Sequence, residues 1–402
     1  MSKFKIVVSD LHLGGGREAE GNRLEDFGSD QEFAVFLDSL AAESERDGSD
    51  VELIVNGDAF EMLQVPHTPS FEPAKRYRSR EYHSSSEEDS VLKMNHIIGG
   101  HPRFFEGLRR FLQPGPPRRY VTFVKGNHDL NLHWSAVQQR IRESVGATGP
   151  RSPLLGFEER CVSREGIYIE HGNQYAEVVD RIEDMEDPLD PERPGQLALP
   201  LGSWFVMNVF NKVERERYWI DGVKPITALV WYALAFDFPF AARAIATLIR
   251  ALPGIIHDGV LDTADPRAGF VARLEDPDQV QALADRYQQS EAFRTEFNAA
   301  VANILAPPPE LLGMDAAPLL GTPDPVDMGD QIRRRARSSL FDMAAKRAAE
   351  EGARVVSFGH THDAGVEGLP DGGVYINSGT WTWRAEFSGD DKETWRDLFA
   401  HP

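Results

Sequence analysis

Five short β-rich runs, each ending in a cluster of polar residues, constrain the fold of this chain more than any other feature. The runs cover residues 4–9, 51–56, 120–125, 166–170 and 354–358. Helical patterns near 30–46 and 88–113 lie between the first three runs, and another near 135–145 follows them. This alternation is the signature of a layered α/β fold. In such folds ligands gather beyond the carboxyl ends of the strands, where loops from distant parts of the sequence converge.

The residues that end the five runs are of the kinds that bind divalent cations. A lone histidine or aspartate of this sort fits a polar turn, but seven at corresponding strand ends are hard to explain as independent accidents. The only cysteine is Cys161, so a cation would have to be bound by carboxylates and imidazoles, and two cations about 3.5–4 Å apart would need a bridging carboxylate. The candidate ligands are Asp10, His12, Asp58, Asn127, His171, His360 and His362.

In their order and content, these blocks resemble the calcineurin-like metallophosphoesterase superfamily. The matching blocks are Ser9-Asp10-Leu11-His12, Gly57-Asp58, Gly126-Asn127-His128-Asp129, His171-Gly172 and Gly359-His360-Thr361-His362. The resemblance covers residues 1–175 and 352–385, and it implies a four-layer αββα sandwich with a two-metal centre at its edge. It places Asp10, His12 and His362 on one metal, Asp58 as the bridge, and Asn127, His171 and His360 on the other.

The resemblance also implies two catalytic groups outside the ligand set. His128 is expected to stabilise developing charge on the phosphate or to protonate the leaving oxygen, with Asp129 orienting or charging its ring. Two divalent ions are expected as cofactors, manganese first, although a mixed nitrogen and oxygen ligand set also accepts Fe, Zn, Co or Ni. A water that bridges two cations falls in pKa from 15.7 toward about 7, so hydroxide can attack the phosphorus without a phosphoenzyme.

The block after Asp58 bears on the substrate. It reads GDAFEML, which is similar to the GD-x-F-E form of bacterial UDP-2,3-diacylglucosamine pyrophosphatases and related phosphodiesterases, and it differs from the GDYVDRG form of Ser/Thr protein phosphatases. The pyrophosphatase pattern has arginine where this chain has His128, the form general to the superfamily. We therefore expect a phosphodiesterase or pyrophosphatase that acts on a small or lipid-linked phosphate.

Three other functions stay open from the sequence. A phosphomonoesterase would use the same ligands, and a nuclease would need a basic groove, which the formal net charge of −21 disfavours. A scaffold without catalysis would bind a partner through an apolar insertion. The basic run with Arg76, Arg78 and Arg80 could hold a substrate phosphate, since guanidinium groups match phosphate oxygens, or it could be a solvated surface.

Residues 176–351 match nothing in the resemblance and are expected to form a mainly helical cap that selects substrates by size. The metallophosphoesterase core would then comprise residues 1–175 and 352–402. Amphipathic patterns predict helices over 278–304 and 329–351, and a proline-rich stretch between them, 306–325, reads as a loop or linker.

The most apolar part of this insertion is 223–256. Asp237, Arg243 and Arg250 interrupt it, so it lacks the uninterrupted apolar length that a bilayer span requires. It fits a buried helical hairpin, a dimer contact, or a surface that meets lipid or the apolar part of a substrate. The first ten residues lack the pattern of a secretory signal. The expected location is cytoplasmic, with peripheral membrane contact as an alternative.

Overall fold

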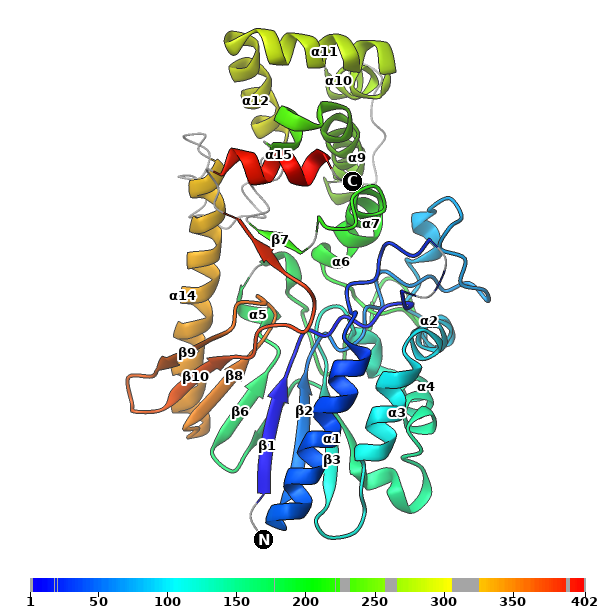
Figure 1. The fold of residues 1–402 in the computed structure, drawn as a ribbon, viewed down its shortest axis with the longest axis vertical. Coiled ribbons are helices and arrows are strands. Elements are labelled where there is room, and N and C mark those ends of the chain that lie inside the picture. Colours follow the sequence, from blue (N-terminus) through cyan, green and yellow to red (C-terminus); the bar gives the residue numbers. More distant parts are fainter. Residues whose placement is uncertain are drawn as a thin grey trace. The chain divides into compact units, whose positions relative to one another are not determined.

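The structure is a computed structural model, and it divides the chain into two compact units. The first comprises Met1–Met207 with Arg335–Trp383, and the second comprises Asn208–Arg334 with Arg384–Pro402. Figure 1 shows their elements coloured along the sequence. The described residues are 3–17, 19, 21–176, 178–220, 222–224, 232–256, 266–305, 325–387 and 391–400.

The first unit contains a four-stranded parallel sheet with helices against one face. Its strands, in spatial order, are β1 (Lys3–Val8), β2 (Asp50–Asn56), β3 (Arg119–Val124) and β4 (Leu155–Glu158). The helices are α1 (Asp30–Asp47), α2 (Glu87–Gly100), α3 (Pro102–Phe111) and α4 (Ser135–Ser144). Parallel neighbours need crossover connections, and α1 to α3 lie in the connections of the first three strands. Phe33, Phe104 and Val137 of the helices share a buried core with Leu53 and Phe123 of the strands.

A second sheet of five strands lies in the same unit. Its spatial order is β5 (Cys161–Arg164), β6 (Ile167–Glu170), β8 (Val355–Phe358), β10 (Val374–Asn377) and β9 (Gly365–Gly368). The three inner strands run parallel, and the two edge strands pair antiparallel to them. Residues on α14 (Pro325–Glu351), such as Leu340 and Ala344, share a core with Tyr168 and Val356 of this sheet.

The two sheets contact each other through a small buried cluster. Ile54 and Val124 from the first sheet pack against Val162 and Ile169 from the second. Because the helices cover one face of the first sheet and the second sheet covers the other, β2 and β3 are buried along nearly their whole length. The carboxyl ends of the central strands of both sheets can therefore contribute to one site.

The five predicted strands are all present, and two predicted helices are each divided in two. The pattern 88–113 becomes α2 and α3, because Pro102 begins a new helix and cannot continue the old one without losing a hydrogen bond. The pattern 278–304 becomes α11 (Pro277–Gln289) and α12 (Glu291–Leu305), separated at Ser290. The predicted helix 329–351 lies within α14. The predicted linker 306–325 falls almost wholly outside the described residues.

The second unit is mainly helical. Besides α11 and α12 it contains α7 (Asn211–Glu214), α9 (Phe238–Ile256), α10 (Pro266–Glu275) and α15 (Lys392–Ala400), with β7 (Val223–Lys224) and β11 (Ala385–Glu386) as a short parallel pair. Ala242, Ile245 and Ile249 of α9 are buried, so this part of the apolar run packs inside the unit as a buried helix does. Within the described residues, no helix has the length and apolarity needed to cross a membrane.

The boundaries of the units differ from the predicted ones at three places. Residues 176–207, which contain α6 (Leu201–Phe205), belong to the first unit, where Ile182 and Leu197 pack on Leu130. Residues 335–351 also belong to it, as the part of α14 that covers the second sheet. The carboxyl-terminal residues 384–402 belong to the second unit, not to the core.

Candidate metal centre

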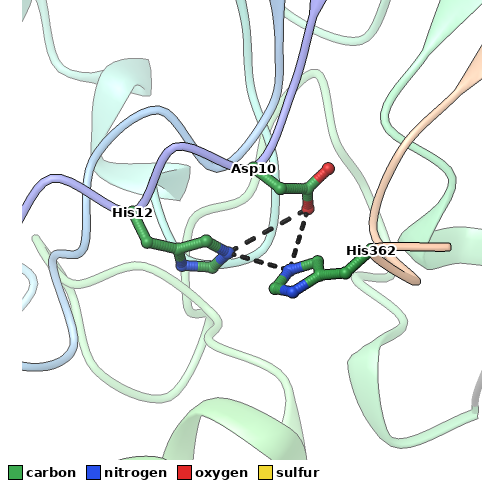
Figure 2. Close-up of side chains that lie close together, drawn as sticks. All are labelled: Asp10, His12 and His362. Carbon is green, nitrogen blue, oxygen red and sulfur yellow. Dashed lines mark hydrogen bonds and ion pairs between the residues drawn. The ribbon is translucent and has the colours of Figure 1, made fainter. Parts of the chain in front are cut away.

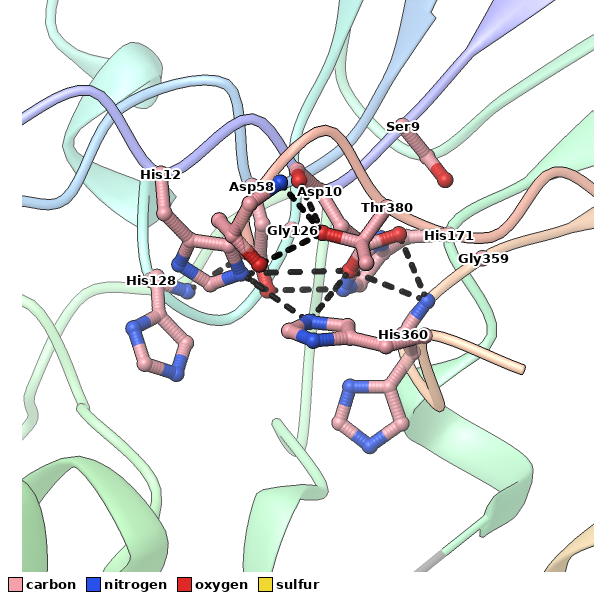
Figure 3. Close-up of polar contacts among 12 residues, drawn as sticks. Ser9, Asp10, His12, Asp58, Gly126, His128, His171, Gly359, His360 and Thr380 are labelled. Carbon is pink, nitrogen blue, oxygen red and sulfur yellow. Dashed lines mark hydrogen bonds and ion pairs between the residues drawn. The ribbon is translucent and has the colours of Figure 1, made fainter. Parts of the chain in front are cut away.

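Loops at the carboxyl ends of both sheets meet in one cluster of polar side chains (Figure 3). Short connections after β1, β2, β3, β6 and β8 carry its members. The cluster contains all the predicted ligands, namely Asp10, His12, Asp58, Asn127, His171, His360 and His362. The structure thus brings together residues that lie as much as 352 positions apart in the printed sequence, from the tenth to the 362nd.

Asp10, His12 and His362 form the first group of donors (Figure 2). The Nε2 atoms of His12 and His362 lie 3.2 Å apart, and His362 Nε2 lies 3.4 Å from Asp10 Oδ1. His12 Nε2 lies 4.0 Å from the same carboxylate oxygen. Asp10 is fully buried, and its carboxylate accepts hydrogen bonds from the backbone N–H of His360.

Asp58, His171 and His360 form the second group. His171 Nε2 lies 3.0 Å from Asp58 Oδ2 and 3.2 Å from the amide oxygen of Asn127. The other ring nitrogen of His171 lies 3.0 Å from the backbone carbonyl of Asn56, which fixes the orientation of the ring. Asn127 adds an uncharged oxygen donor to this group.

Asp58 faces both groups. The same oxygen, Oδ2, that lies 3.0 Å from His171 Nε2 lies 3.9 Å from His12 Nε2. Its other oxygen accepts a hydrogen bond of 2.8 Å from the backbone N–H of His128. Asp58 therefore lies between the two groups of donors.

The spacing of these donors fits a shared cation. Two donors at about 2.1 Å from one ion, at an angle of about 90–110°, lie about 3.0–3.4 Å apart. Four separations, of 3.0–3.4 Å, match this value, and the separation of His12 Nε2 from Asp10 Oδ1 is longer, at 4.0 Å. These buried groups of Asp and His side chains could hold a metal ion.

The backbone at the ligands is strained. Among the described residues, six other than glycine have positive φ, and five of them are predicted ligands: Asp10, His12, Asp58, His360 and His362. Each such residue costs about 1–3 kcal/mol and persists only where the surrounding structure holds it. Strain of this kind collects at functional sites, and here it turns successive side chains of one loop in different directions.

Glu61 is a member of the site that sequence analysis missed. Its Oε2 lies 2.8 Å from Nδ1 of His12 and 2.6 Å from Nδ1 of His128, and it is buried. A carboxylate on Nδ1 orients the ring and leaves Nε2 available, which is the usual support of a metal-binding histidine. The signal was present in the sequence, because Glu61 is the glutamate of the GDAFEML block.

Asp129 does not take the position that was expected of it beside the ring of His128. Its carboxylate accepts hydrogen bonds from the backbone N–H groups of Gly126 and Ala59, at 2.7 and 2.8 Å. Burial and the charge of Asp58 raise the pKa of Asp129 to about 7, against those two hydrogen bonds. Asp129 therefore holds the loops after β2 and β3 together, and Glu61 is the carboxylate on His128.

Burial opposes every charge in the cluster, yet the charges stabilise one another. Hydrogen bonds and charges of the histidines outweigh burial for the carboxylates, so the pKa values of Asp10, Asp58 and Glu61 lie below their usual range, that of Glu61 at about 2. The carboxylates in turn outweigh burial for two histidines and raise the pKa of His12 to about 9 and that of His171 to about 10. The cluster attracts positive charge, and a divalent cation that bound there would displace protons.

His360 behaves in the opposite way. Burial, together with the charge of His171, lowers the pKa of His360 to about 3. Its ring is therefore neutral at physiological pH and offers a lone pair to a cation.

The predicted substrate-binding arginines are not part of the cluster. Arg76, Arg78 and Arg80 are exposed. Nη1 of Arg78 lies 3.5 Å from Oε1 of Glu81. This ion pair is exposed and contributes little to stability. Within the described part of the chain, no hydrogen bond or ion pair joins these arginines to the donor groups.

Comparison with protein-family profiles and with curated proteins found no match for this chain.

Proposed function

We propose that this chain is a hydrolase of phosphoric esters that uses two divalent cations, and that it is a calcineurin-like metallophosphoesterase with a four-layer αββα core. The order of contacts supports this fold: α1 to α4 pack on the first sheet, the first sheet on the second, and the second on α14. The donor cluster at the carboxyl ends of strands from both sheets supports the class of site.

The observation that carries the proposal is the position of Asp58. One oxygen of this carboxylate lies between a nitrogen of each donor group, at 3.0 and 3.9 Å. A single cation would not require a carboxylate between two sets of nitrogen donors. Asp10, His12 and His362 would hold one cation, and Asn127, His171 and His360 the other.

Two cations in such a site supply a nucleophile from water at neutral pH and neutralise phosphoryl oxygens. The protein's own contribution centres on His128. Its Nδ1 is held by Glu61, so Nε2 is the ring atom left to face a substrate. Burial opposes protonation, but the charges of Glu61 and Asp58 raise the pKa of His128 well above its usual range, so the ring can donate a proton to a leaving oxygen.

A phosphodiester or pyrophosphate is the proposed substrate class, with manganese as the first cation to test. The protein is stripped with a chelator, reloaded with Mn²⁺, Fe²⁺, Zn²⁺, Co²⁺ or Ni²⁺, and assayed on bis-p-nitrophenyl phosphate, p-nitrophenyl phosphate and single-stranded DNA. We expect turnover of the diester only after reloading. Turnover of the monoester alone would indicate a phosphomonoesterase, salt-sensitive cleavage of DNA a nuclease, and bound metal without turnover a scaffold.

Asp58→Asn tests the bridging position. This change keeps the shape of the side chain and removes its charge, so we expect loss of bound metal and a fall in kcat/KM of more than about a hundredfold. His128→Ala should lower kcat while both metals stay bound. Asp371→Asn, at an exposed position just before β10, is the matched control and should change neither. An Asp58→Asn protein with full metal content and full activity would refute the proposal.

A further inference from the structure

A carboxylate that is not among the predicted ligands lies beside the metal centre. Asp180 ends a short helical turn, Val178–Asp180, after β6. Its Oδ2 lies 3.6 Å from Nε2 of His360. This distance is too long for a hydrogen bond, but it places the carboxylate at the edge of the metal centre.

A hydrogen bond fixes the backbone of Asp180, and a neighbouring glycine leaves room for its carboxylate. The side-chain N–H of buried Asn173 donates a hydrogen bond of 2.9 Å to the backbone carbonyl of Asp180. On the other side, a Cβ at position 202 would lie 2.0 Å from Asp180 Oδ1, so only glycine leaves room for the carboxylate. The position of the charge beside His360 is therefore built into the fold of the first unit.

Asp180 lies on the side of the cluster that solvent reaches. The side chains of His128 and His362 are each 21% exposed, whereas those of Asp10, Asp58 and His171 are at most 2% exposed. A substrate must therefore approach from the side of His128 and His362. The side chain of Asp180 is itself 17% exposed, and its charge acts on His128.

A negative charge at this place acts differently on different phosphates. A phosphodiester carries one negative charge, whereas a phosphomonoester has a second pKa near 6 and carries nearly two at pH 8. Repulsion by a fixed carboxylate grows with the charge of the substrate. The monoester is therefore penalised more than the diester.

We propose that Asp180 is a specificity-determining residue that favours singly charged phosphodiesters over doubly charged phosphomonoesters. The inference rests on the proposed function and adds the residue that sets the preference for a diester over a monoester. It assigns to Asp180 a role in selecting the substrate and not in binding the metal.

Asp180→Asn tests this role, because the amide keeps the shape of the carboxylate and removes its charge. Metal-loaded wild type and variant are assayed at pH 8 on bis-p-nitrophenyl phosphate and p-nitrophenyl phosphate. We expect the ratio of the diester kcat/KM to the monoester kcat/KM to fall about tenfold, mainly because the monoester is turned over faster. Glu183→Gln, at an exposed position three residues away, removes the same charge and should leave the ratio unchanged.

The experiment distinguishes failure of this inference from failure of the proposed function. If Asp180 only positions His360 or binds metal, the variant loses metal and both activities fall by the same factor, which would overturn the inference. An unchanged ratio with full metal content would overturn it as well. Wild type that binds metal and hydrolyses neither ester would instead refute the proposed function. Metal content by mass spectrometry and far-UV circular dichroism show whether the variant is folded and loaded.

Discussion

At the scale of single residues, the candidate metal centre requires glycine at position 126, because there is no room for a side chain there. A Cβ on Gly126 would lie 2.1 Å from Oδ1 of Asp58 and 2.6 Å from its backbone nitrogen. No rotation of a side chain relieves a clash with backbone, so any larger residue must displace the loop of Asp58.

We expect Gly126→Ala to lower metal content and the diester kcat/KM by at least about tenfold. Gly99→Ala is the matched control, because a Cβ there would meet nothing within 4 Å. Gly99 lies inside α2, so its replacement should stabilise the protein by up to about 1 kcal/mol. Metal analysis and thermal melts compare the two variants. Equal metal loss in both would show that the close contact between Gly126 and Asp58 does not determine metal binding.

Residue types and order were enough to predict which side chains meet in the cluster, but not which residues support them. Asp10 and Asp58 each lie two residues after the end of a strand, so the end of the strand locates them. Glu61 and Asp180 reach the site through the course of a loop, and loop paths depend on tertiary packing that periodicity does not contain. The resemblance implied that Asp129 orients or charges the ring of His128, but the path of the loops after β2 and β3 places its carboxylate on the backbone N–H groups of Gly126 and Ala59.

At the scale of elements, His101 joins three parts of the first unit. It precedes α3, its Nδ1 lies 3.0 Å from Asp30 of α1, and its Nε2 lies 3.3 Å from buried Glu25. Burial opposes the charged ring, but the hydrogen bonds to Asp30 and Glu25 outweigh burial and raise the pKa of His101 to about 9. The folded protein therefore binds this proton more tightly than the unfolded chain does.

The pH dependence follows from the sign of that change. The stabilisation is fully present below the unfolded pKa of about 6.5 and is lost as pH rises through about 9, with a total of about 3 kcal/mol. Urea unfolding of wild type and His101→Gln at pH 6 and pH 9.5 measures this contribution. We expect the difference between the two proteins to shrink by about 3 kcal/mol at the higher pH. The same difference in the free energy of unfolding at both pH values would show that the protonated ring of His101 does not stabilise the fold.

Strands were easier to locate than helix ends. The runs of β2 and β3 are rich in β-branched and other apolar residues, and each ends in a polar cluster, so composition marks them. The split between α2 and α3 was missed because the amphipathic pattern continues through Pro102, although proline at a first helical position is itself a start signal. The break at Ser290 has no such mark.

At the scale of the whole molecule, the division into units does not follow the order of the sequence. The chain leaves the first unit after Met207, returns at Arg335, and ends in the second unit from Arg384. The start of the insertion was placed at residue 176, where the resemblance ends, whereas the second unit begins at Asn208, and nothing local marks the return of the last residues. The expectation that the insertion is a cap over the metal centre stays a prediction.

The carboxyl-terminal helix supplies a large part of the second unit's core. Trp395 of α15 is fully buried, with its ring 5.0 Å from that of Tyr232 and 5.5 Å from that of Phe387. Replacement of a buried tryptophan by alanine costs about 3–5 kcal/mol, because the surrounding side chains cannot fill the cavity. All the predicted metal ligands belong to the first unit. Trp395→Ala should therefore weaken the second unit and leave the metal centre intact.

Hydrogen exchange and metal analysis together test this independence. In Trp395→Ala we expect faster exchange in α9 and α15, with metal content equal to that of wild type. Trp134→Ala is the reciprocal control, because Trp134 packs on the core of the first unit and its indole N–H donates a hydrogen bond of 2.8 Å to the carbonyl of Ser85. That variant should lose metal and keep slow exchange in α9. Equal metal loss in both variants would contradict this independence. The cavity left by Trp395→Ala lies in the second unit, so metal loss in that variant would mean that the two units unfold together.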